Sequence, residues 1–151
     1  MKQTVFFLTL ILAYFTLGCS DLRLTPSGVV LRYHKALQSG DIPELRATMT
    51  RDAYLELLAE AIPNLNGSGA VFEHDVIYFK MDMNAQKRLE ERLGKYLKAL
   101  PESTIRLIGE NAAGENSREI YLERNGKREK VLLIGVDNQW KISRMPEGTR
   151  N

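Results

Sequence analysis

The sequence predicts an α+β fold, with N-terminal helices and one long helix packed on a curved, mainly antiparallel sheet. Two patterns predict this class. Apolar residues recur at helical spacing through most of residues 25–100, and they alternate with polar residues between turn signals after residue 105. A chain of 151 residues, 44% hydrophobic and 26% charged, suits one globular domain. We expect residues 25–146 to form this domain and residues 147–151 to form a short tail.

Capping residues mark the first two helices. Thr25 offers a capping hydroxyl, and Pro26 suits the first position of a helix. The Ser39-Gly40-Asp41 turn ends this helix, and Asp41 with Glu44 three residues later resembles a capping box for the next one. The apolar side of the first helix consists of Val29, Val30, Tyr33 and Leu37.

A third helix begins at about Arg51, and we expect Pro63 to end it. Its apolar side consists of Tyr54, Leu57, Leu58, Ala61 and Ile62. Residues 64–69 are rich in Asn, Gly and Ser, which predicts a loop. Residues 70–80 are rich in β-formers and apolar on both faces near their end, which predicts a strand buried on both sides.

The longest helix covers about residues 84–100 and ends before Pro101. Four strands follow it. We expect turns at residues 111–116, at Asn125-Gly126 and at Asp137-Asn138, of which Asn-Gly is the strongest hairpin signal. Ile105 and Leu107 alternate with polar residues, Ile120 and Leu122 define a core face, and Trp140 and Ile142 belong to the last strand.

The N-terminal segment has the pattern of a targeting signal. Lys2 supplies a positive charge, residues 4–17 carry none, and polar residues resume at Ser20. A membrane-spanning helix needs about 20 apolar residues, so this run is too short, whereas it suits a signal peptide. The single cysteine of the chain, Cys19, lies directly at its end.

The stretch Thr16-Leu17-Gly18-Cys19 resembles a bacterial lipobox, although Thr16 stands where leucine is commonest. The resemblance implies a signal peptide at 1–18, cleavage before Cys19, acyl chains on that cysteine and a lipidated tether at 19–24. Two or three acyl chains would hold the protein to a lipid bilayer, whereas one binds only marginally. In a source with two membranes, Ser20 rather than aspartate after the cysteine implies an outer-membrane protein that faces the periplasm.

A second resemblance concerns the domain. The stretch "TPSGVVLRYHKALQSGDIPELRATMT" and the terminal "VLLIGVDNQWKIS" are similar to the cone-shaped, nuclear-transport-factor-like (cystatin-like) superfamily. Enzymes of that fold place an Asp or His base and a Tyr or Asp oxyanion donor inside the cone. Carried onto this chain, the resemblance implies a possible pocket lined by Tyr33, His34, Tyr54, Phe72, His74 and Asp75. Adjacent strand residues face opposite ways, so His74 and Asp75 cannot form a dyad with each other.

Other classes of site are not supported by the sequence. His34 and His74 are 40 positions apart without the spacing of metal ligands, and no P-loop, nucleophile elbow or dinucleotide fingerprint occurs. We therefore expect no metal, no cofactor and no catalytic residues. A net charge of +2 without a concentrated basic patch disfavours nucleic-acid binding.

Two groups of charged residues are expected on the surface of the domain. Basic residues decorate the long helix, and a mixture of basic and acidic residues that includes Arg124 and Glu129 surrounds the Asn125-Gly126 hairpin. Either group could touch anionic lipid. We favour solvated side chains that keep the sheet edges soluble and unpaired.

The sequence thus favours a membrane-anchored, non-catalytic protein of the cell envelope that binds a small apolar ligand or a protein partner. One alternative is an isomerase or hydratase of the same fold that uses His74 or Asp75 with a tyrosine. Another is a structural homo-oligomer with the open sheet face as its interface. The oligomeric state itself is left open.

Overall fold

The structure is a computed structural model that describes residues 25–66 and 82–144, with only the backbone described at 62–66. Within these residues, four helices precede four strands. The helices are α2 (Pro26–Ser39), α3 (Ile42–Thr48), α4 (Arg51–Asn66) and α6 (Met83–Ala99). The strands are β1 (Ile105–Gly114), β2 (Ser117–Arg124), β3 (Lys127–Val136) and β4 (Gln139–Arg144), and they form a curved antiparallel sheet in the order β1-β2-β3-β4.

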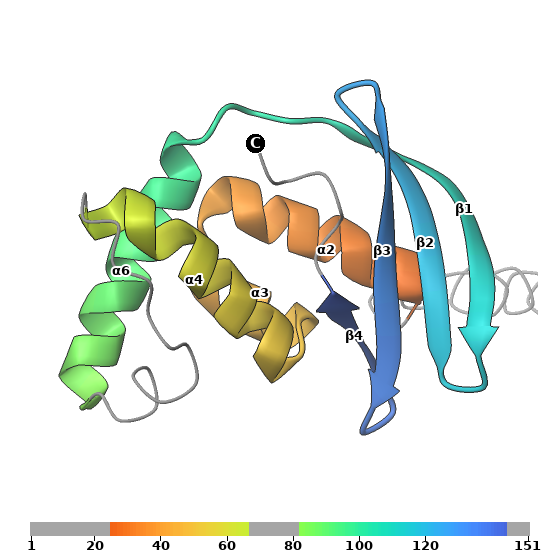
Figure 1. Ribbon diagram of the computed structural model, residues 1–151, viewed down its shortest axis with the longest axis horizontal. Coiled ribbons are helices and arrows are strands. Elements are labelled where there is room, and N and C mark those ends of the chain that lie inside the picture. The colour runs from red at the N-terminus through yellow and green to blue at the C-terminus, as the bar shows by residue number, and fades with distance from the viewer. Residues whose placement is uncertain (1–24, 67–81, 145–151) are drawn as a thin grey trace, which may run out of the picture.

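The helices gather on one side of the sheet, and α2 extends from the helical layer to the strands (Figure 1). Contacts of α2 reach β1, β2 and β4, while α6 packs against the three other helices. A long extended connection carries the chain from α6 across to β1 (Figure 1). These features confirm the predicted α+β class.

The caps of the first helices agree with the sequence. The Thr25 hydroxyl accepts a hydrogen bond from the Gly28 N–H at 3.0 Å, and the Asp41 carboxylate accepts one from the Glu44 N–H at 3.1 Å. Between them, Gly40 adopts a left-handed conformation with φ of 63° and closes the end of α2.

The predicted end of the third helix was wrong. α4 continues through Pro63 to Asn66, so the first three residues of the expected loop at 64–69 are helical. Pro63 has no backbone N–H to donate, and α4 nevertheless continues past this position. The strand expected at 70–80 lies outside the described residues.

The long helix and two of the three turns match the sequence. Asp82 caps α6 by accepting from the Ala85 N–H at 2.8 Å. Both residues of the turns Asn125-Gly126 and Asp137-Asn138 have positive φ, as type I′ hairpins require. The turn expected at 111–116 is shorter, because residues 111–114 continue β1 and pair with β2 despite their weak β propensity.

The core lies between the helices and the inner face of the sheet. Thr50 anchors the start of α4 to the outer edge of β4, since its N–H donates to the Ile142 carbonyl at 2.8 Å. The most deeply buried side chains come from every described element except β1 and include Val30, Tyr33, Leu45, Ala53, Leu93, Ile120, Val131, Leu133 and Ile142.

Candidate functional site

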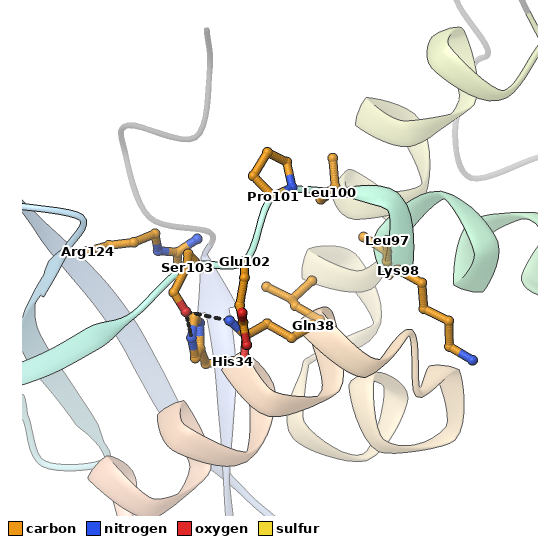
Figure 2. Close-up of a pocket in the computed structure, with 10 residues that line it drawn as sticks. His34, Gln38, Leu97, Lys98, Leu100, Pro101, Glu102, Ser103 and Arg124 are labelled. Atoms are coloured by element: carbon orange, nitrogen blue, oxygen red, sulfur yellow. Dashed lines mark hydrogen bonds between the residues drawn. The ribbon is translucent and has the colours of Figure 1, made fainter.

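A pocket of about 260 Å³ lies beneath the connection between α6 and β1. One wall comes from α2, another from the end of α6, and β2 contributes a single side chain (Figure 2). The pocket combines apolar and polar side chains. Its lining consists of His34, Leu37, Gln38, Leu97, Lys98, Leu100, Pro101, Glu102, Ser103 and Arg124.

His34 and Gln38 hold the connection against α2. They lie one helical turn apart, and both side chains point at the Ser103 carbonyl oxygen (Figure 2). His34 Nε2 lies 2.9 Å from that oxygen, and the Gln38 amide nitrogen also donates to it. A carbonyl can only accept, so Nε2 of His34 must carry the proton.

The environment of His34 favours its uncharged form. Burial lowers the pKa of His34 below its ordinary value, the hydrogen bond to Ser103 opposes this shift, and the nearby Arg124 charge adds to it. His34 is therefore a neutral donor near pH 7.

Arg124 reaches the same pocket from the sheet and is paired with Glu129 of β3. Its Nε lies 3.2 Å from the Glu129 Oε2, and the two side chains are only 15% and 7% exposed. Neither of these two atoms makes a well-aligned hydrogen bond within the described part of the chain. The expectation that both residues are solvated around the hairpin was wrong, because both lie on the inner face of the sheet.

The alternation of the strands could have revealed this pair. Arg124 follows Ile120 and Leu122 at steps of two, and Glu129 precedes Val131 at the same step. Each charged residue thus shares a face with buried apolar ones. The other basic residues of the hairpin, Lys127, Arg128 and Lys130, are exposed as expected.

Tyr33 is adjacent to His34 in sequence but lies in the core, where it is 1% exposed. Burial is the main reason that the pKa of Tyr33 is raised far above its ordinary value, although the Arg124 charge opposes the shift. Its hydroxyl stays protonated at any physiological pH. Tyr33 is not part of the pocket lining at His34.

Tyr54 belongs to a different pocket, near the start of α4. Its ring is 5% exposed, and its hydroxyl donates to the Glu90 carboxylate of α6 at 3.3 Å. The structure therefore does not bring His34 and Tyr54 into one pocket. The remaining predicted site residues, Cys19, Phe72, His74 and Asp75, lie outside the described residues.

Residues 25–66 and 82–144 contain no group of three or more His, Cys, Asp or Glu side chains that could hold a metal ion. In the same residues, no helix is both long and apolar enough to span a membrane.

Comparison with known proteins assigns no family. No family profile matches the chain, and neither the curated proteins nor the solved structures include a significant match. The two resemblances drawn from the sequence therefore stay predictions.

Proposed function

We propose that this protein is a lipid-anchored component of the bacterial cell envelope whose domain binds a small, mainly apolar ligand without transforming it. The pocket at His34 carries the binding part of this proposal. Leu37, Leu97 and Leu100 offer it apolar surface, while His34 and Gln38 are committed to the Ser103 carbonyl. Such a combination suits retention of a ligand, with the leucines against its apolar body and Lys98, Glu102 and Arg124 as polar contacts in the lining.

The anchoring part of the proposal rests on the first 24 residues. Acylation of Cys19 at the end of an uncharged stretch would give the mature protein two or three lipid chains. Only five residues separate Cys19 from Thr25, the cap of α2. At roughly 3.5 Å per residue, the domain would stay within about 20 Å of the bilayer. The proposed location is the periplasmic side of the outer membrane.

Metabolic labelling tests the anchor. Cells that express the full chain are grown with radioactive palmitate, and we expect label in the wild type but not in Cys19→Ala. Ser20→Asp should keep the label and move the protein to the inner-membrane fraction of a density gradient. A wild-type chain that incorporates no label would overturn the anchoring proposal.

Nuclear magnetic resonance of leucine methyl groups tests the pocket. The lipidated chain is placed in phosphatidylcholine nanodiscs and titrated with indole as a neutral apolar probe. We expect saturable shifts of the Leu37, Leu97 and Leu100 methyl signals. Leu31 is a control within the same sample, because it is 43% exposed and outside the pocket lining. Equal, non-saturable shifts of all four leucines would contradict binding in the pocket.

The alternative is an isomerase or hydratase of the same fold, in which the buried hydroxyl of Tyr33 would donate to an oxyanion. This function requires the base His74 or Asp75 to share the interior with Tyr33. Nuclear Overhauser contacts between the Tyr33 and His74 rings, or between the Tyr33 ring and the Asp75 β-protons, would support it, and their absence would remove it.

A further inference from the structure

The pocket at His34 is polar at one end and apolar at the other. Arg124, the last residue of β2, lies at one end, and Leu100 and Pro101, directly after α6, lie toward the other (Figure 2). Leu100 is 46% exposed and Pro101 is also exposed, so both offer apolar surface that a ligand can cover. A ligand that fills the pocket therefore meets a guanidinium and an apolar surface at once.

Arg124 offers hydrogen-bond donors to this pocket. Its contact with Glu129 is made at Nε, 3.2 Å from the Glu129 Oε2. A guanidinium has five N–H donors and no acceptor, and only one of these donors is on Nε. Among the residues that the structure describes, no hydrogen bond uses the donors on the two Nη atoms of Arg124. Because the side chain is only 15% exposed, a ligand in the pocket would shield these donors from solvent and must supply an acceptor for them.

The charges around the pocket are balanced. Glu129 already supplies a counter-charge for Arg124, and the exposed side chains Lys98 and Glu102 in the lining have opposite signs. His34 is neutral near pH 7, because burial lowers its pKa. A carboxylate bound to Arg124 would lie close to the Glu129 carboxylate, which would repel it. A neutral acceptor, such as a carbonyl oxygen, takes the hydrogen bond without adding a charge.

We propose, on the basis of the function proposed for this pocket, that its ligand is a neutral compound with a carbonyl group at one end. The class includes ketones, esters and amides. The carbonyl oxygen accepts from Arg124, and the apolar body lies against Leu100 and Pro101. A hydrocarbon would leave the Arg124 donors without an acceptor, and a carboxylate would place a second negative charge beside Glu129.

Three probes with one ring system test the polar group. The full lipidated chain in phosphatidylcholine nanodiscs is titrated with 1-indanone, with indane, which lacks the carbonyl, and with indane-1-carboxylate. Empty nanodiscs give the fraction of each probe that enters the lipid. We expect 1-indanone to bind about 10-fold more tightly than either of the others, because it alone gives Arg124 a neutral acceptor. Equal or tighter binding of indane, or of the carboxylate, would overturn the proposal.

The leucine methyl signals distinguish failure of this proposal from failure of the proposed function. Saturable shifts of Leu37 and Leu100 with equal affinities for indane and 1-indanone would retain an apolar pocket and reject the carbonyl. The absence of a saturable shift with all three probes would reject the pocket as a binding site.

A double variant removes the donor together with its counter-charge. Arg124→Met with Glu129→Leu should reduce the advantage of 1-indanone over indane to less than about 2-fold and leave the affinity for indane within about 3-fold of the wild type. Arg106→Met with Glu123→Leu is the matched control, since this ion pair lies outside the pocket lining, and it should keep the full advantage. Urea denaturation establishes that both double variants are folded. An undiminished advantage in Arg124→Met with Glu129→Leu would contradict the role of Arg124.

The infrared spectrum of bound 1-indanone reports the hydrogen bond directly. A donor at the oxygen weakens the C=O bond and lowers its stretching frequency. We expect a lower frequency in the wild type than in Arg124→Met with Glu129→Leu. The same frequency in both proteins would show that the carbonyl does not lie at Arg124 and would overturn the proposal.

Discussion

The guanidinium Nε of Arg124 lies 3.2 Å from the Glu129 Oε2, across the hairpin that joins β2 to β3. In the strand register, Arg124 is opposite Lys127 and Glu129 is opposite Leu122, so the charged pair is diagonal. Both residues point toward the helices. The structure thus places an ion pair on the inner face of the sheet at its hairpin end, beside the pocket at His34.

Breaking this pair should destabilise the domain. Glu129→Gln keeps the size of the side chain but leaves the Arg124 charge buried without a counter-charge. We expect the free energy of unfolding to fall by about 3 kcal/mol, measured by urea denaturation. Replacing both partners, as in Arg124→Met with Glu129→Leu, should restore stability to within about 1 kcal/mol of the wild type.

A solvent-exposed pair provides the control. Arg106 contacts Glu123 at 3.0 Å, and the Arg106 side chain is 74% exposed. Arg106→Gln should therefore lower the free energy of unfolding by less than about 1 kcal/mol. Similar losses in Glu129→Gln and Arg106→Gln would show that burial does not set the energy of the inner pair.

His34 should make stability depend on pH. Its pKa is lower in the folded protein than the ordinary value of about 6.5, so the unfolded chain binds more protons between the two values. The free energy of unfolding should therefore be highest above about pH 6.5 and should fall as the pH drops through the pKa of folded His34. His34→Gln retains a donor for the Ser103 carbonyl and should lose less stability between pH 7.5 and 5. Parallel curves for the two proteins would contradict this role.

Gly40 should be more sensitive to substitution than its φ alone suggests. A Cβ at Gly40 would lie 2.3 Å from the Gly94 carbonyl oxygen, because α2 and α6 approach closely there. Gly40→Ala should lower the free energy of unfolding by about 2–4 kcal/mol through both backbone strain and this overlap. Gly126→Ala has a similar positive φ with no atom within 4 Å of the new Cβ, so it should cost about 1 kcal/mol. Equal losses in urea denaturation would argue against the overlap.

The hydroxyl of Tyr54 should contribute to the packing of α4 on α6. Tyr54→Phe removes its 3.3 Å hydrogen bond to Glu90 and should lower the free energy of unfolding by about 1 kcal/mol. Tyr121→Phe removes a hydroxyl that donates to Glu119 on the other face of the sheet. We expect the smaller effect in Tyr121→Phe, because solvent can replace that bond, and the reverse order would contradict this interpretation.

Local signals in the sequence predicted the elements well where they act within a few residues. Thr25 and Asp41 cap helices as expected, and the Asn125-Gly126 and Asp137-Asn138 turns are where the sequence indicates them. Pro63 and residues 111–114 were misassigned. In the second case, pairing with β2 supplies hydrogen bonds that outweigh weak local preference.

Local signals do not indicate how a site is assembled, because a pocket depends on residues distant in sequence. His34 and Ser103 are 69 positions apart, and nothing near either residue indicates their hydrogen bond. Tyr33, His34 and Tyr54 were expected to share a pocket, and the structure places them in the core and in two separate pockets. Lys141 meets the end of α3 only because β4 runs beside it.

By itself, the sequence determined the α+β class, the order of the described helices and strands and most of their ends. Helix caps, type I′ turns and apolar periodicity act over a few residues, so they can be identified without a partner segment. The tertiary structure alone decided that His34 is committed to Ser103 and that Arg46, Arg51 and Lys141 line the same pocket as Met49 and Tyr54. These relationships depend on how the helices pack on the sheet, and packing joins residues whose local sequences carry no information about each other.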